Sequence, residues 1–228
     1  MITGASRGFG KASARALAQR DWDLIIDART EADLSRSAEE LRALGTGTVT
    51  AIPGDIADLH HVAALSTAAA DTDRLDLLVN NASVLGPSPQ PPLDVYPIDV
   101  LRQVLEVNLI GPLRLIQTTI PLLRQTKGTI INVTSDAAVE GYEGWGGYGS
   151  SKAALEQISN VLAAEEPSVK VYWFDPGDMN TRMHQEAYPG EDISDRPDPA
   201  ERVPALLALI DGSHPSGRYA ASDLLVTM

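Results

Sequence analysis

Short apolar runs alternate with stretches of helical spacing along this chain, and the alternation is the feature that most constrains its fold. The runs are rich in Val, Ile and Leu, and they occupy residues 24–26, 49–52, 75–79, 129–133 and 169–174. Short continuous runs of this kind are typical of strands buried on both faces. Helical spacing occupies residues 11–20, 98–124, 151–164 and 200–210. Strands that alternate with helices predict a parallel sheet with helices on both faces.

Composition narrows the class of protein. The chain has 228 residues, a length expected of one domain, which we assign to residues 1–228. Its formal net charge of −13 argues against nucleic acid and anionic membrane surfaces as partners. The absence of Cys excludes disulfides and thiolate chemistry, and the four His show no ligand spacing, so no metal site is expected. Without a secretory signal or an apolar run near the roughly 20 residues of a membrane span, we expect a cytoplasmic protein.

A glycine-rich segment opens the chain and leads into the first helical pattern. Glycines at positions 4, 8 and 10 allow close approach of backbone to a ligand, and the helix start that follows offers N–H groups to a phosphate. The pattern alone is equally consistent with a tight strand-to-helix turn. Its spacing, TGxxxGxG, differs from the GxGxxG dinucleotide fingerprint. It resembles the nucleotide-binding turn of short-chain dehydrogenases/reductases.

Other segments resemble the same family, and the resemblance extends over essentially the whole chain. The sequence Asn80-Asn81-Ala82-Ser83 is similar to the family's NNAG motif, with Ser83 in place of the glycine. The resemblance implies a single Rossmann-like, doubly wound α/β domain with about seven parallel strands, the last near residues 217–221. It also implies a set of nucleotide contacts beside the turn, after the third and fourth strands and after the sixth. These are Gly4, Ser6, Arg7, Gly8, Phe9, Gly10, Asp55, Ile56, Asn81, Pro176, Gly177 and Thr181.

The end of the second strand bears on the choice of nucleotide. In NAD-binding proteins an acid at this place holds the ribose 2′-hydroxyl, whereas NADP(H) needs cationic groups for its 2′-phosphate. The family position for that acid is Ala28 here, and Arg29 follows it. Arg29 and Arg7 offer the forked donors that suit a phosphate, so NADP(H) is favoured over NAD(H). Asp27 should point away from the Ala28 side by strand alternation, although a one-residue shift would make it the ribose acid.

Tyr148 and Lys152 begin a helical pattern, and their four-residue separation places them on one face of the helix. A tyrosine is a poor base near neutral pH. An adjacent ammonium together with an oxidised nicotinamide would favour the phenolate and lower the pKa of the tyrosine. The pair would then act as a general acid and base. Taken alone, the pair is also compatible with an amphipathic tyrosine on a surface helix.

Two further residues complete a possible active site. Ser135 ends the fifth strand, at the edge of the sheet where ligands bind. Asn108 lies inside a helical pattern, where a buried amide must find partners. With Tyr148 and Lys152 they match the family tetrad in order and spacing. The resemblance implies hydride transfer between NADP(H) and a small carbonyl or alcohol, with Tyr148 protonating the oxygen and Ser135 orienting it. It further implies that Lys152 holds the nicotinamide ribose and that Asn108 holds a relay water.

Alternative functions remain compatible with these residues. One is a catalytically silent NADP(H)-binding sensor of the same fold, and another is epimerisation or elimination on the same scaffold. The resemblance also implies a homodimer or homotetramer that pairs through the apolar positions of residues 98–124.

Several local features carry expectations of their own. The first strand is reduced to two residues before Thr3, so we expect a weakened sheet centre and a natural product that begins upstream. Residues 177–199 are long for a connection and predict a lid or binding loop. The histidines are expected in surface positions or loops. The side chains expected to wall the substrate pocket are Val84, Leu85, Tyr142, Trp145, Met179 and Met183. Asp175 departs from the family pattern without an evident role.

Overall fold

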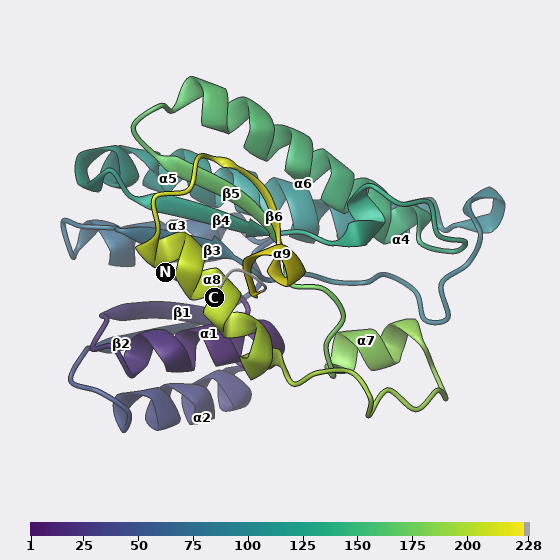
Figure 1. The fold of residues 1–228 in the computed structure, drawn as a ribbon, viewed down its shortest axis with the longest axis horizontal. Helices are drawn as coiled ribbons and strands as arrows, with labels where there is room; N and C mark the ends of the chain where they lie inside the picture. Colours follow the sequence, from purple (N-terminus) through teal and green to yellow (C-terminus); the bar gives the residue numbers. More distant parts are fainter. Residues whose placement is uncertain (226–228) are drawn as a thin grey trace.

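The computed structural model describes residues 1–225, in which a parallel sheet is covered by helices on both faces (Figure 1). Within this part of the chain six strands form, in the spatial order β2-β1-β3-β4-β5-β6, with the N-terminal residues between β1 and β3. All strand pairs are parallel. The strands are β1 Leu24–Ala28, β2 Val49–Pro53, β3 Leu77–Asn80, β4 Thr129–Val133, β5 Lys170–Asp175 and β6 Gly217–Ala220. The doubly wound α/β architecture expected from the sequence is confirmed.

The first strand is very short, but it still joins the neighbouring strands β1 and β3. Ile2 bridges β1 through Ile26 and β3 through Val79, both in parallel orientation. The Ile2 N–H donates to the Ile25 carbonyl at 2.9 Å, and the Thr3 N–H donates to the Val79 carbonyl at 3.0 Å. Backbone groups of β1 and β3 therefore find partners on this stub, and the weakened sheet centre expected from the sequence is not observed.

The helices follow the strands and differ from the sequence-based expectation in several places. The helices at Glu31–Arg42 (α2), Leu59–Ala70 (α3), Arg182–Ala187 (α7) and Ala221–Leu225 (α9) were not predicted. The continuous helix expected over residues 98–124 is divided by a π-helical turn at Glu106–Ile110. A short 3-10 helix, Pro199–Arg202, precedes the helix expected at residues 200–210. The α-helices are α1 Gly8–Ala18, α2 Glu31–Arg42, α3 Leu59–Ala70, α4 Ile98–Leu105, α5 Gly111–Thr126, α6 Gly146–Glu165, α7 Arg182–Ala187, α8 Val203–Asp211 and α9 Ala221–Leu225.

Two hydrophobic cores lie on the two sides of the sheet. One joins the sheet to α1, α2 and α8, with Leu17, Leu34 and Leu206 at most 1% exposed. The other joins it to α3 and α5, with Leu65 and Leu115 fully buried. Strands β1 and β3 are buried along their whole length, which explains their continuous apolar character. Packing of the sheet between these two layers of helices fixes the positions of the strand ends, from which the functional loops emerge.

The connection after β5 leaves the main body and carries α7 (Figure 1). The hydroxyl of Ser88, in the proline-rich loop after β3, donates to the Glu186 carbonyl of α7 at 2.6 Å.

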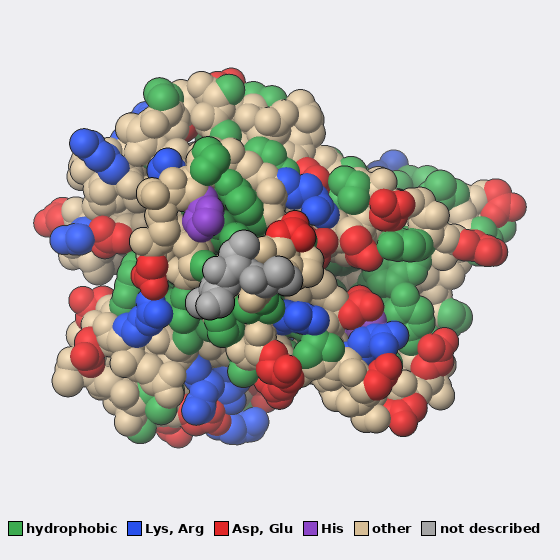
Figure 2. Space-filling model, viewed as in Figure 1, with side chains coloured by type: hydrophobic (Ala, Val, Ile, Leu, Met, Phe, Trp, Pro, Cys, Tyr) green, Lys and Arg blue, Asp and Glu red, His purple; other side chains and the backbone are tan. Residues whose placement is uncertain are grey.

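The surface charge is mixed in sign on the face shown in Figure 2, where Lys and Arg side chains are interspersed with Asp and Glu. The protein therefore presents local cationic groups although its net charge is negative. Among the described residues, no helix has the length and apolarity required to cross a membrane.

Candidate active site

A cleft of about 1360 Å³ runs along the carboxyl ends of the strands, from the glycine-rich turn to α6 and α7. This edge is where ligands bind in open parallel sheets. Two predicted site residues, Gly10 and Asn108, lie behind the cleft wall. The other predicted residues line the cleft: Gly4, Ser6, Arg7, Gly8, Phe9, Arg29, Asp55, Ile56, Asn81, Ser135, Tyr148, Lys152, Pro176, Gly177 and Thr181.

The glycine-rich turn is held from behind by Asn81. The Asn81 amide donates to the carbonyls of Thr3 and Gly4, at 2.9 and 3.2 Å. A Cβ on Gly10 would lie 2.4 Å from that amide nitrogen, so Gly10 serves packing behind the turn rather than direct contact with the cleft. Gly4 has a φ of +68°, in the left-handed region that favours glycine. Helix α1 begins after Arg7 with no side-chain cap, which leaves its first N–H groups for another partner.

Asp27 also supports this turn. One carboxylate oxygen accepts from the Gly4 N–H at 2.7 Å, and the other lies 2.9 Å from Nε2 of His61 on α3. Asp27 is 2% exposed and His61 is 6% exposed. The carboxylate therefore has close protein partners on both oxygens, which leaves it poorly placed to hold a ribose. The expectation that the histidines lie at the surface is wrong for His61, and also for His184, which is 9% exposed.

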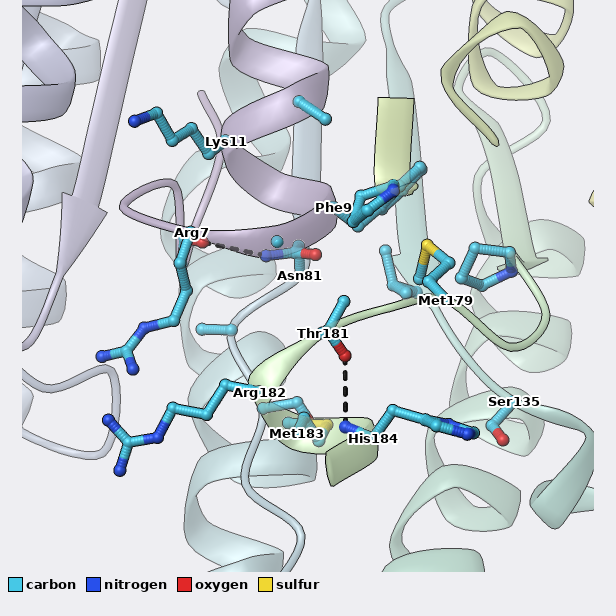
Figure 3. A pocket seen from close by; sticks show the side chains of 18 of the residues that line it. Arg7, Phe9, Lys11, Asn81, Ser135, Met179, Thr181, Arg182, Met183 and His184 are labelled. Carbon is cyan, nitrogen blue, oxygen red and sulfur yellow. Dashed lines mark hydrogen bonds between the residues drawn. The ribbon is translucent and has the colours of Figure 1, made fainter. Parts of the chain in front are cut away.

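Arg7 and Arg29 are exposed and lie along the turn-proximal part of the cleft. Neither guanidinium forms an ion pair with any residue in the described part of the chain. In Figure 3 the side chains of Arg7, from the turn, and Arg182, from α7, extend toward the same side of the cleft. Arg182 pairs with Glu186 at 2.7 Å, so among the described residues the free positive charge of this half of the cleft comes from Arg7 and Arg29.

Tyr148 and Lys152 lie on one face of α6 and are both buried. The Lys152 ammonium donates to the Val133 carbonyl at 2.8 Å and lies 5.5 Å from the centre of the Tyr148 ring. Burial raises the pKa of Tyr148, the charge of Asp175 raises it further, and hydrogen bonds to Ser83 and Ser135 oppose the rise. In the protein alone, loss of hydration dominates the pKa of Tyr148; the lowering expected beside an ammonium and an oxidised nicotinamide stays a prediction.

Burial lowers the pKa of Lys152 to about 8, although the carboxylate of Asp175 acts in the opposite direction. Between pH 8 and 10.5 the unfolded chain binds a proton at this lysine that the folded chain has released, so stability rises with pH. The free energy of unfolding of the native protein minus that of Lys152→Met should therefore rise by on the order of 2 kcal/mol between pH 7 and 9.5. Urea unfolding of both proteins at the two pH values measures this difference. A constant difference would contradict the buried, weakly basic lysine.

Asn108 is fully buried in the π-helical turn between α4 and α5, and its side chain is fully engaged. Its oxygen accepts from the Ser83 hydroxyl at 3.0 Å and from the Val84 N–H at 2.8 Å. Its nitrogen donates at 2.9 Å to the Val84 carbonyl and to the Ser151 hydroxyl. An amide has two donor hydrogens and two acceptor positions, so all four are used. The relay water expected at Asn108 could contact only its backbone.

Ser83 and Asp175 depart from the family pattern, as the shortened first strand does, and both side chains contact other residues of the site. Ser83 joins Asn108 to Tyr148, since its hydroxyl donates to the amide and also interacts with the phenol. Asp175 is buried at the end of β5 and accepts from the Gly177 N–H at 2.9 Å. Arg218 on β6 donates to Asp175, at 3.2 Å, and to the Ser135 carbonyl at 3.3 Å. These contacts tie Asp175 to the loop that carries Ser135.

The end of the cleft near α7 is apolar and aromatic. Leu85 and Tyr148 form a buried cluster, with Trp145 and Met183 packed against it. The Trp145 ring meets the Tyr148 ring edge-on, at 5.7 Å between centroids. Val84 and Met179 line the cleft as expected. Tyr142 does not, because its hydroxyl donates to Asp136 at 2.9 Å and its ring faces a separate, shallower depression.

The comparisons with known proteins agree with this geometry. Residues 1–192 match the sequence model of the short chain dehydrogenase family. Sepiapterin reductase of Mus musculus is 34% identical over 197 residues, which cover 81% of this chain and 76% of the mouse protein. Oxidoreductase claN of Passalora fulva is 35% identical over 198 residues, which cover 86% of this chain and 88% of that protein.

Solved structures show the same fold. An alcohol dehydrogenase of Thermococcus sibiricus in complex with 5-hydroxy-NADP superposes with a TM-score of 0.87 at 27% identity, covering 96% of this chain and 93% of its own. A protein of Shigella flexneri in complex with NADP superposes with a TM-score of 0.90 at 26% identity, covering 97% and 95%. The chain belongs to the short-chain dehydrogenase family of oxidoreductases, as its sequence motifs indicated.

Proposed function

We propose that this chain is a single-domain, NADP(H)-dependent oxidoreductase that interconverts a small carbonyl compound and the corresponding alcohol. One observation carries the proposal: Tyr148, beside the hydroxyls of Ser83 and Ser135 and backed by Lys152, faces the cleft that begins at the glycine-rich turn. A proton donor and a polarising hydroxyl thus stand at one end of a cleft whose other end is suited to a dinucleotide.

The residues of the cleft fit NADP(H). The start of α1, which has no side-chain cap, suits the pyrophosphate. Arg7 and Arg29 supply unpaired guanidinium groups for the 2′-phosphate. NADP and 5-hydroxy-NADP are bound by the Shigella flexneri and Thermococcus sibiricus relatives, respectively, which supports the same nucleotide here. The remaining contacts would come from Asp55 and Ile56 toward the adenine, Asn81 behind the turn, and Pro176, Gly177 and Thr181 toward the nicotinamide.

The reaction places distinct demands on the residues of this chain. When bound, the reduced nicotinamide would supply the hydride, that is two electrons and one proton, that the carbonyl carbon receives. Tyr148 donates the proton that the carbonyl oxygen needs, and solvent returns a proton to the phenolate. At neutral pH the Tyr148 hydroxyl carries the proton that this step requires. Ser135 orients the oxygen, and Lys152 holds the nicotinamide ribose.

Two measurements on the purified chain test the proposal. Fluorescence titration with NADPH and with NADH should show tighter binding of NADPH. The decrease in NADPH absorbance should then reveal turnover with a panel of aldehydes and ketones that includes sepiapterin, because several relatives carry the name sepiapterin reductase. Tight NADPH binding without turnover of any carbonyl would favour the silent sensor, and preference for NADH would contradict the proposed nucleotide.

Arg29→Ala should weaken NADPH binding about tenfold, because one charge-assisted contact to the 2′-phosphate is lost. The same substitution should change the Kd for NADH by less than about twofold, since NADH lacks that phosphate. Fluorescence titration of both nucleotides measures the two effects, and Arg7→Ala should behave in the same way. Arg36→Ala is the matched control, because Arg36 pairs with Asp33 on α2 outside the cleft. Equal losses for NADPH and NADH would assign Arg29 to another part of the nucleotide.

A further inference from the structure

His184 lies on α7 with its imidazole enclosed in the substrate end of the cleft, and it is 9% exposed. Its ring packs on Tyr188, with the ring centroids 4.9 Å apart, and its backbone N–H donates to the Thr181 hydroxyl at 3.1 Å. Within residues 1–225, its Nε2 is buried and has no hydrogen-bond partner. A buried nitrogen without a partner is unfavourable, so a state in which Nε2 gains one is stabilised relative to this one.

The other ring nitrogen indicates which kind of partner Nε2 needs. Nδ1 of His184 lies 3.6 Å from a carboxylate oxygen of Asp178, in the same loop. A negative oxygen on that side favours the tautomer with its hydrogen on Nδ1. Nε2 then carries a lone pair and acts as an acceptor. Its missing partner is therefore a donor, such as a hydroxyl or an N–H group.

The imidazole extends toward one of the residues proposed to bind the reacting carbonyl. Figure 3 shows the imidazole extending from α7 toward Ser135, which lines the same cleft. Trp145 and Met183 line the same end of the cleft, and Trp145 packs on both Tyr148 and Tyr188. The acids Asp136, Asp175 and Asp178 line this end together with the cation Lys152, and a further pair, Arg182 with Glu186, balances its own charge, so the excess of acids disfavours an anionic substrate.

We propose that His184 is a substrate-binding residue that accepts a hydrogen bond from a hydroxyl or amino group next to the reacting carbonyl of a neutral aromatic substrate. This assignment rests on the proposed function, because it takes Tyr148 and Ser135 as the site of the carbonyl. The aromatic body packs against Trp145, and the donor group relieves the unpartnered Nε2. Specificity for hydroxyketones over simple ketones follows from that one contact.

Binding of matched alcohols to the NADPH-loaded protein tests the contact separately from turnover, because the reduced nucleotide cannot accept a hydride from an alcohol. The ligands are 1-phenyl-1,2-ethanediol and 1-phenylethanol, which differ in a single hydroxyl, and calorimetry gives their affinities. The diol should bind about tenfold more tightly, the size expected for one buried hydrogen bond. The ketone pair 2-hydroxyacetophenone and acetophenone should show a similar ratio of kcat/KM with NADPH.

Two variants identify the residue that causes the preference. His184→Phe keeps a ring against Tyr188 and removes both nitrogens, so it should bind the two alcohols equally and retain the NADPH affinity. His184→Gln restores an acceptor and should recover part of the preference. His214→Phe is the control, because His214 packs on Tyr219 and does not line the cleft.

The outcomes separate this proposal from the function on which it rests. Equal affinities in the native protein, or a preference that survives in His184→Phe, would overturn the assignment of His184. A His184-dependent preference for the diol, with no reduction of either ketone, would support the contact and count against the proposed reaction. Reduction of both ketones at equal rates would support the reaction and overturn the specificity assigned to His184.

Discussion

Tyr148→Phe is expected to lower kcat for carbonyl reduction about 10³-fold while the Kd for NADPH changes by less than about twofold. The phenol is the proposed proton donor, and phenylalanine keeps the ring that packs against Trp145. Nucleotide affinity should persist because the turn and the two arginines are unchanged. Stopped-flow absorbance with saturating NADPH measures the rate, and fluorescence titration measures the binding.

Tyr142→Phe is the matched control for this substitution. Tyr142 lies six residues upstream, is exposed, and hydrogen-bonds Asp136 rather than lining the cleft. Its loss should change kcat by less than about twofold, consistent with an exposed hydrogen bond of small net contribution. A Tyr148→Phe protein that retained most of its activity would show that another group, such as Ser135 or a water, supplies the proton.

Asp27→Ala is expected to reduce the free energy of unfolding by about 3 kcal/mol. The substitution leaves the Gly4 N–H and the buried His61 ring without their carboxylate partner. The glycine-rich turn loses the contact that fixes Gly4, so we also expect NADPH and NADH affinities to fall together, about tenfold each. Urea unfolding and nucleotide titration measure the two effects.

Asp23→Ala offers a comparison from the same region of the chain. Asp23 is an exposed carboxylate that accepts hydrogen bonds from the Thr48 N–H and hydroxyl outside the cleft, so its loss should lower stability less than Asp27→Ala does and leave nucleotide affinity unchanged. A selective loss of NADH binding in Asp27→Ala would instead make Asp27 the ribose acid. Restored stability in the double variant Asp27→Ala/His61→Ala would locate the main penalty in the unpaired histidine.

Much of the fold could be predicted because the sheet is buried on both faces. Strands enclosed in this way must be continuously apolar, and the runs at residues 24–26 and 129–133 fall inside β1 and β4. Helices α2 and α3 were missed for two different reasons. Helix α2 buries only a narrow stripe in a largely charged sequence, and the Ala-rich α3 has little contrast between its faces. The π-helical turn at Glu106–Ile110 was hidden because apolar spacing continues through it.

The sequence by itself determined the topology class and the spacing of Tyr148 and Lys152, since both depend on local periodicity. Tertiary structure decided how the remaining polar groups are used. Asp27 meets His61 across 34 residues, Asp175 meets Arg218 across 43, and Asn108 meets Ser151 across 43. It also decided that Nε2 of His184 has no partner among the described residues. These outcomes depend on which elements the folded sheet brings together, and contacts between distant segments leave no periodic signal in a single sequence.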